Sequence, residues 1–263
     1  MSNKVIINHK ISQFKKTINV SGDKSISIRW VLFSSLASGV SKAKNLLMSE
    51  DVKAALNAIK QFGIKSEFKN NICKIFGKGI NGYKYKEKIV IDAKNSGTLG
   101  RLILGLLINS PYPVKLIGDK SLSKRDFTRV TKPLSKFGAT FQLNKNKTLP
   151  LKIIGSKNLV PINYLENKGS AQCKSSIIFG GIRANGTTVI KARKSRNHTE
   201  ILCKYLNLPI TVKTKKNFDQ IKIKNVKKIK PLNYNIPSDI SSGAFFIALT
   251  ALSPKSELII KNV

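Results

Sequence analysis

The sequence predicts an α/β fold assembled from repeats of one helix-and-sheet unit. An opening motif of small and polar residues recurs about every 70 residues, and an apolar, helix-like run follows each opening. In the first three copies a cation comes four residues after the start of the motif, and these cations lie 72 and 73 positions apart: Arg29, Arg101 and Lys174. A period of this length is typical of a supersecondary unit that stacks on its neighbours.

Each copy is expected to contain two helices. The first follows the opening, with apolar runs that begin at Trp30, Leu102 and Ser176. The second is polar at its start and ends in a turn, over residues 49–64, 125–139 and 196–208. In the earliest of these second helices, apolar residues follow the i, i+3, i+4, i+7 spacing of an amphipathic helix: Val52, Ala55, Leu56, Ile59 and Phe62. Its expected ends are an N-cap at Ser49 and a C-terminal turn at Gly63.

Strands are expected between the helices. Short β-rich runs begin at Ile72, Lys88, Pro113, Thr187 and Ile221. A fourth opening, at Ser238, leads to the strand ELIIKNV before any second helix. We therefore expect the chain to be part of a larger assembly of repeats.

Composition indicates a folded, soluble protein. With 263 residues and 41% hydrophobic content, the chain can bury one large core or two smaller ones. No apolar run reaches the roughly 18 residues of a membrane span, and the first ten residues lack the apolar stretch of a secretory signal. We expect a cytoplasmic protein with no membrane contact. Cys73, Cys173 and Cys203 have no CxxC spacing and few histidines beside them, so buried, reduced thiols are expected and no metal site.

The net charge of +35 raises the alternative of nucleic-acid binding. Of the 48 basic residues, however, only seven are arginine, and the lysines are spread over nearly every segment without interleaved aromatic residues. This distribution favours a composition bias over a specific nucleic-acid surface. The arginines are more informative, because lysine cannot reproduce their planar fork of donors: Arg29, Arg101, Arg125, Arg129, Arg183, Arg193 and Arg196.

The openings of the repeats predict an anion-binding pocket. In GDKSISIR, Lys24 and Arg29 place two cations near a helix N-terminus, and Ser25 adds a hydroxyl. The second and third openings repeat this logic with small and polar residues: Asn95, Gly97, Thr98, Ser170, Gln172 and Lys174. A single serine before a helix is more often a cap than a ligand. Three such openings in register on one symmetric scaffold point to a multiply anionic ligand.

The order of these motifs resembles a known family. The motifs are GDKSISIR, NLLMSEDVKAALNAIKQFGI, AKNSGTLGR, GDKSLSKRDFTRVTKPLSKFGA, KGSAQCKSS, SRNHTE and SDISSGAFFIA. Together they resemble 5-enolpyruvylshikimate-3-phosphate synthase (3-phosphoshikimate 1-carboxyvinyltransferase) over the chain from about residue 10. The resemblance implies the enolpyruvyl transferase fold, with two domains of three repeats each and a site between them.

The family transfers the enolpyruvyl group of phosphoenolpyruvate to the 5-hydroxyl of shikimate 3-phosphate in the shikimate pathway, which leads to chorismate and the aromatic amino acids. It implies these two small-molecule partners, no cofactor and a monomer. It also divides the chain: residues 1–20 and 236–263 belong to an incomplete second domain, and residues 21–235 form a complete first domain. The acid-base residue is then expected in the absent part, so the chain alone should be inactive. Exposed apolar residues from Ala244 onward should favour self-association.

The resemblance also implies roles for individual residues. Lys24 would contact both substrates, Ser25 and Arg29 the shikimate carboxylate and ring, and Gln172 the ring. Gly97 and Arg125 would contact phosphoenolpyruvate. The 3-phosphate would lie against Ser170, Ala171 and Ser195. Supporting roles are expected for Glu50, Asn95, Thr98, Arg101 and Lys174.

One departure from the family pattern and two alternatives accompany this interpretation. Asp126 stands where the family usually has proline, which places a carboxylate next to Arg125.

The first alternative is the related UDP-N-acetylglucosamine enolpyruvyl transferase, which is disfavoured by the order of SAQCKS and SRNHTE and by the lack of a cysteine in the expected loop. The second is a non-catalytic, basic binding module.

Overall fold

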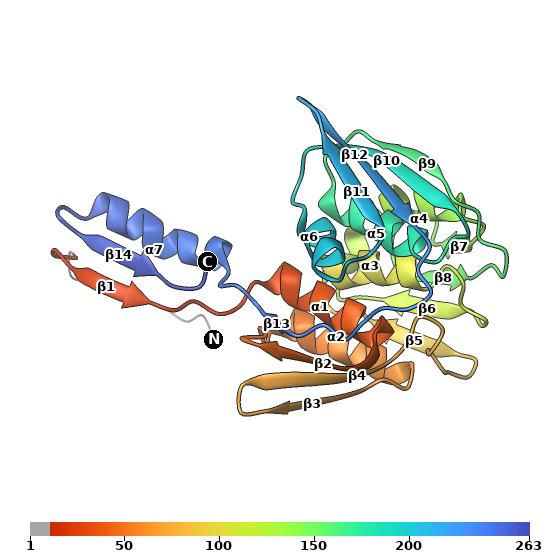
Figure 1. Cartoon of the computed structure of the whole chain (residues 1–263), viewed down its shortest axis with the longest axis horizontal. Helices are drawn as coiled ribbons and strands as arrows, with labels where there is room; N and C mark the ends of the chain where they lie inside the picture. The colour runs from red at the N-terminus through yellow and green to blue at the C-terminus, as the bar shows by residue number, and fades with distance from the viewer. Residues whose placement is uncertain (1–10) are drawn as a thin grey trace.

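A computed structural model describes residues 11–263 of the chain, and the first ten residues of the expected segment 1–20 lie outside it. Three four-stranded sheets account for most of the strands, and each has two helices beside it (Figure 1). In every sheet one parallel strand pair is followed by two antiparallel pairs. The repeat seen in the sequence is therefore a repeat of topology.

The first unit combines three strands from an early part of the chain with one strand from a much later part. Its sheet has the order β13-β2-β4-β3, made of β2 (Ser38–Lys44), β3 (Lys65–Lys69), β4 (Ile72–Lys78) and β13 (Tyr234–Asn235). Its helices are α1 (Lys24–Leu36) and α2 (Glu50–Gln61). The parallel edge strand β13 follows the third unit in sequence, so the last part of the body closes the first sheet.

The second and third units take their strands from continuous segments. The second sheet has the order β5-β6-β8-β7, made of β5 (Ile89–Asp92), β6 (Val114–Ile117), β7 (Thr140–Leu143) and β8 (Leu151–Ile154). Its helical segments are α3 (Gly97–Leu106), η1 (Leu122–Lys124) and α4 (Thr128–Ser135). The third sheet has the order β11-β12-β10-β9, made of β9 (Asn163–Glu166), β10 (Thr187–Arg193), β11 (Ile210–Thr214) and β12 (Phe218–Lys224). Its helices are α5 (Ala171–Gly181) and α6 (His198–Tyr205).

The first helix of each unit is buried almost all round, as expected for a helix without an exposed polar face. Phe33 of α1 and Phe179 of α5 have ring centroids 4.6 Å apart. On α3, a Cβ added to Gly105 would lie 2.2 Å from the carbonyl oxygen of Ser176 on α5, so only glycine permits this approach. The inner helices α1, α3 and α5 thus form the centre of the core.

A smaller part of the described chain stands apart from this body. Strands β1 (Lys15–Ile18) and β14 (Glu257–Ile260) pair in parallel beside α7 (Ile240–Leu252), and two chain segments join them to the body (Figure 1). These segments are tied together, since the Asp23 amide donates to the Pro237 carbonyl at 2.8 Å and the Asp239 amide to that of Ser21 at 2.9 Å. On α7, Phe245 is 80% and Leu252 84% exposed.

The observed starts of α1, α3 and α5 differ from the alignment of the three opening motifs in the sequence. The side chains that cap α1, α3 and α5 are Asp23, Ser96 and Ser170, each accepting a bond from the first turn. Ser25 and Gly97 therefore lie inside their helices, although the sequence motif aligns them with Ser170. Ser49 precedes α2 as predicted, but its hydroxyl makes no capping bond.

Two further expectations concern composition. All three cysteines are buried, as predicted, and burial raises the pKa of the Cys73 thiol to about 11. In the part of the chain that the structure describes, no helix is both long and apolar enough to cross a membrane.

Candidate functional site

The N-terminal turns of the inner helices meet at one cleft. Its volume is about 640 Å³, within the usual range for small-molecule sites. The residues that line it come from all three units: Lys24, Ser25, Ser49, Glu50, Asp51, Asn95, Ser96, Gly97, Thr98, Arg125, Gln172 and Arg196. The three openings therefore contribute residues to one cleft, whereas binding of an anion there stays a prediction.

Lys24 is held at the edge of this cleft by an ion pair. Its Nζ lies 2.8 Å from Oδ2 of Asp51, and the side chains are 49% and 18% exposed. Lys24 starts α1 and Asp51 lies in the first turn of α2, so the pair joins two helix N-termini. Because the ammonium group remains half exposed, it can still receive an anionic ligand.

Gln172 connects the second and third units in the cleft wall. Its Oε1 accepts a bond of 2.6 Å from Nη1 of Arg101, and its Nε2 donates to Oγ1 of Thr98 at 3.0 Å. Arg101 is buried over the ring of Phe127, and this burial lowers the pKa of its guanidinium to about 10. Arg101 therefore positions Gln172 from behind the cleft, and its supporting role in ligand binding stays a prediction.

Arg125 faces the cleft from the second unit. Its Nη2 donates to Oδ1 of Asn95 at 3.2 Å, and the side chain is exposed. A Cβ added to Gly97 would lie 3.2 Å from Nη1 of Arg125 and 2.8 Å from that of Arg101. Glycine at this position thus gives both guanidinium groups room beside the helix start.

Among residues 11–263, the Asp126 carboxylate forms no ion pair with Arg125 and bonds to Thr128 instead. Oδ1 accepts from the Thr128 amide at 2.6 Å and Oδ2 from the Thr128 hydroxyl at 2.8 Å. Partial burial opposes ionisation, but these bonds outweigh it and lower the pKa of Asp126. The Asp126 carboxylate therefore accepts hydrogen bonds from Thr128, the first residue of α4.

Arg29 lies beneath the cleft and does not line it. Its guanidinium donates to Oγ1 of Thr199 at 2.8 Å, to the Ser25 carbonyl at 2.9 Å and to Oγ of Ser175 at 3.1 Å. The group is 3% exposed, and burial lowers its pKa to about 10. Its observed partners join α1 to α5 and α6. Contact of Arg29 with a shikimate carboxylate stays a prediction.

The residues expected around a 3-phosphate lie at the start of α5 and after β10, outside the cleft lining. Ser170 uses its hydroxyl to accept from the Cys173 amide at 3.2 Å, and its own amide donates to Oε2 of Glu166 at 3.0 Å. Ala171 is half-buried in the first turn of α5. The hydroxyl of Ser195 is buried and has no hydrogen-bond partner among residues 11–263.

Lys174 corrects the view of the repeated cation as part of an anion pocket. It is fully buried, and its Nζ lies 2.6 Å from Oε1 of Glu200 on α6. Together with Arg29 and Arg101, it shows that the cations repeated every 72 or 73 residues are buried and connect helices. The cations that line the cleft are instead Lys24, Arg125 and Arg196. Of these, Arg196 was not assigned a site role from the sequence, although the scarcity of arginine could have indicated it.

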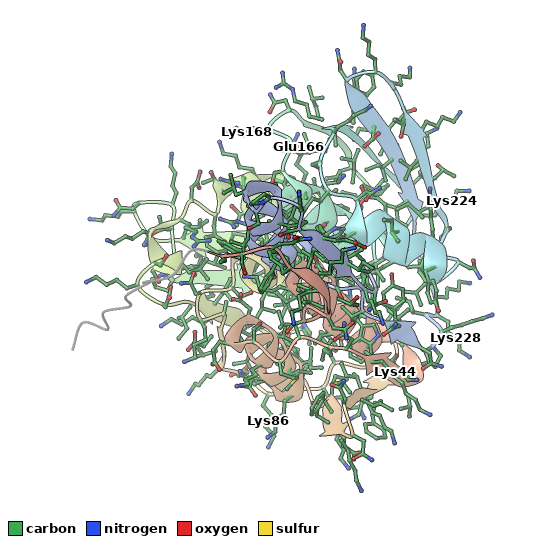
Figure 2. All side chains as sticks on the ribbon, turned by 90° about the vertical axis from the view of Figure 1, so that its left-hand side faces the viewer. Lys44, Lys86, Glu166, Lys168, Lys224 and Lys228 are labelled. Carbon is green, nitrogen blue, oxygen red and sulfur yellow. The ribbon has the colours of Figure 1, made fainter. Side chains whose placement is uncertain are left out.

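Two observations show where the charge and the other hollows lie. Basic side chains project on all sides of the body, as Lys44, Lys86, Lys224 and Lys228 illustrate, so positive charge is not confined to the cleft (Figure 2).

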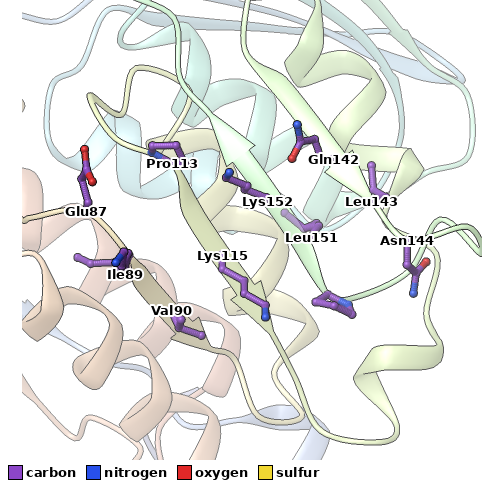
Figure 3. Close-up of a pocket in the computed structure, with 12 residues that line it drawn as sticks. Glu87, Ile89, Val90, Pro113, Lys115, Gln142, Leu143, Asn144, Leu151 and Lys152 are labelled. Atoms are coloured by element: carbon purple, nitrogen blue, oxygen red, sulfur yellow. The ribbon is translucent and has the colours of Figure 1, made fainter.

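A larger pocket, of about 720 Å³, lies on the outer face of the second sheet. Val90, Lys115 and Lys152 lie side by side in its wall (Figure 3). It contains no helix N-terminus, and we place the candidate site in the cleft.

Comparison with known proteins agrees with these motifs. A family model described as EPSP synthase (3-phosphoshikimate 1-carboxyvinyltransferase) matches residues 8–263. The chain belongs to the EPSP synthase family. Its relatives include 3-phosphoshikimate 1-carboxyvinyltransferases from Caldicellulosiruptor saccharolyticus, 40% identical over 252 residues, and from Streptococcus agalactiae, 38% identical over 251 residues.

Solved EPSP synthase structures confirm the predicted fold class. A structure from Acinetobacter baumannii matches with a TM-score of 0.86 and 35% sequence identity, over 95% of this chain and 56% of that one. The two relatives named above are likewise matched over 95% of this chain and 58% of their own length. The chain thus spans somewhat more than half the length of the EPSP synthases it resembles.

Proposed function

We propose that this chain forms the shikimate 3-phosphate side of a 3-phosphoshikimate 1-carboxyvinyltransferase site. The observation that carries this proposal is the convergence of three helix N-terminal regions on one cleft lined by Lys24, Arg125 and Arg196. Helix N-termini and cations both favour anions, and shikimate 3-phosphate carries a phosphate and a carboxylate. Membership of the EPSP synthase family supplies the substrate class.

The proposed reaction forms a carbon–oxygen bond between the enolpyruvyl group and the 5-hydroxyl oxygen of shikimate 3-phosphate. The bond from that group to phosphate breaks, and the hydroxyl proton leaves through an acid-base residue. Within this scheme, Gln172 lies against the ring, and Gly97 and Arg125 receive phosphoenolpyruvate. We propose that the 3-phosphate binds at the start of α5 beside Ser170 and Ala171, and that Ser195, whose buried hydroxyl has no partner among residues 11–263, supplies a further contact.

The proposed division of the chain follows the family. Residues 21–235 would form one domain, and residues 1–20 and 236–263 would contribute to a second. A polypeptide of these 263 residues alone is then expected to bind shikimate 3-phosphate weakly and to show no turnover. Turnover needs preorganised groups on both sides of the transferred group. Release of phosphate from phosphoenolpyruvate that depends on shikimate 3-phosphate would contradict the second part of this expectation.

The substitution Ser25→Ala tests whether the cleft binds shikimate 3-phosphate. Ser25 lines the cleft, and its hydroxyl makes no hydrogen bond within residues 11–263, so its loss should leave the fold intact. We expect calorimetry to show that this change weakens shikimate 3-phosphate binding about tenfold, the effect of about 1.4 kcal/mol. The matched control is Ser242→Ala on the exposed helix α7. Equal binding by the wild type and both variants would mean that general positive charge holds the ligand, as in a basic binding module.

A further inference from the structure

A second, smaller cavity lies at the opposite end of the inner helices. Its volume is about 220 Å³, and its lining includes Leu106 at the end of α3 and Arg183 just after α5. Ser35 near the end of α1 reaches the same place through a hydroxyl bond of 2.7 Å to Tyr83. Because α3 begins at the candidate cleft, one helix length of about 15 Å separates the two locations.

Arg183 enters this cavity without a partner. Within residues 11–263 no carboxylate lies within 4.0 Å of its guanidinium, and the side chain makes no hydrogen bond. Its Nε is completely buried and unsatisfied. The contrast with Arg29, which makes three hydrogen bonds, is clear. Buried donors are normally paired, so this fork of donors lacks an acceptor.

The surroundings of Arg183 suit a small oxyanion. The guanidinium carbon lies 6.0 Å from the ring centroid of Tyr83, and burial lowers the pKa of Arg183 to about 10 while leaving it charged at neutral pH. The Tyr85 hydroxyl donates to the Tyr112 carbonyl at 3.2 Å, and the Tyr83 hydroxyl is bonded to Ser35. Both tyrosines therefore line the cavity without offering a free hydroxyl to the ion. Asn81, Asn109 and Ser110 add neutral polar groups, and no carboxylate is among the lining residues.

A competing explanation is that Arg183 balances the negative ends of three helix dipoles. This explains a positive charge at the position. It explains neither the buried, unsatisfied Nε nor the use of arginine in a chain whose basic residues are mostly lysine. A bidentate acceptor accounts for both, because only arginine offers the matching planar fork.

We propose that Arg183 and the adjoining cavity form a small-oxyanion site, for phosphate or a carboxylate, separate from the candidate cleft. The cavity admits an ion rather than a drug-sized molecule. Since the three helix C-termini oppose a negative charge, the bound ion depends on direct bonds to the guanidinium. We expect weak binding, with a Kd on the order of 1 mM.

NMR of arginine side chains tests this directly. The whole chain contains seven arginines, so a ¹⁵N spectrum of the Nε–H groups has few signals, and Arg183→Lys identifies the one of interest. In a phosphate titration at constant ionic strength, we expect a saturable shift of the Arg183 signal. Acetate in a second titration distinguishes carboxylate from phosphate recognition. Signals of Arg125 and Arg196 report separately on the candidate cleft. An unchanged Arg183 signal with both anions would overturn the proposal.

Thermal unfolding gives a second readout. Phosphate should raise the Tm of the wild type more than that of Arg183→Lys, measured against chloride at the same ionic strength. Arg193→Lys is the matched control, because Arg193 is an exposed arginine on β10. If Arg183→Lys destabilises the fold too far, Arg183→Met serves in its place. An equal gain in Tm for the wild type and the Arg183 variant would show that Arg183 only balances the helix ends.

Discussion

Arg101 holds the amide of Gln172, with 2.6 Å between Nη1 and Oε1, and thereby fixes a residue of one repeat from the helix of another. The arginine is buried, whereas the amide reaches the cleft. This is an arrangement in which a buried cation controls the direction of a neutral group at the candidate site.

Gln172→Ala should weaken shikimate 3-phosphate binding and lower stability. The change leaves Arg101 Nη1 and the Thr98 hydroxyl without their partner, which costs about 1–3 kcal/mol of unfolding free energy. Calorimetry and urea unfolding measure the two effects. Gln142→Ala, at an exposed position of β7, is the control and should change neither. Unaltered stability in Gln172→Ala would argue against the observed bonds.

The Lys174–Glu200 pair should be a strong determinant of stability. Removing one partner, as in Glu200→Ala, leaves a buried charge alone and should cost about 3–5 kcal/mol. The double variant Lys174→Met with Glu200→Leu should recover much of this loss. The exposed pair of Glu50 and Lys53 is the comparison, and Lys53→Met should cost less than about 1 kcal/mol in urea unfolding. Similar losses for the two pairs would contradict the burial of the first.

Stability should fall as the pH drops through the ordinary pKa of histidine. Burial, and then the nearby charge of Arg29, lower the pKa of His198 from 6.5, although Asp23 and Asp239 oppose the shift and Arg196 adds to it. Below pH 6.5 the unfolded chain therefore binds a proton that the folded chain does not, and unfolding is favoured. Above that pH both forms are neutral and the effect is absent.

Urea unfolding at a series of pH values tests this expectation. His198→Gln should reduce the loss of stability on acidification, whereas His9→Gln is the matched control at the other histidine, outside the described residues. Identical pH profiles for the wild type and His198→Gln would rule out the proposed contribution of His198.

Two glycines on α3 should respond in opposite ways to alanine. At Gly105 the new Cβ would meet the Ser176 carbonyl oxygen at 2.2 Å, so overpacking should cost about 1–3 kcal/mol. At Gly100 its nearest contacts, at 3.5 Å, are ordinary, and alanine should stabilise the helix by up to about 1 kcal/mol. Thermal unfolding compares the two. A stable Gly105→Ala variant would mean that α3 and α5 lie farther apart.

Much of the fold could be predicted because its signals are local. The spacing of apolar residues after Ser49 predicted α2, and the short β-rich runs predicted strands of the sheets, since each pattern depends on neighbours a few residues away. The predicted starts of the inner helices were less accurate. Asp23, Ser96 and Ser170 are the caps, and the motif alignment missed this because the cation lies at a different helical position in each copy.

The sequence by itself determined the α/β class, the repeat and the family resemblance, because these follow from order and spacing along the chain. Only the tertiary structure decided that Lys174 and Arg101 point inward while Lys24, Arg125 and Arg196 reach the cleft. The direction of a side chain depends on the rotation of its helix against partners far away in sequence, such as Glu200 for Lys174 and Gln172 for Arg101. A motif records which charges are present, whereas packing between repeats sets which of them a ligand can reach.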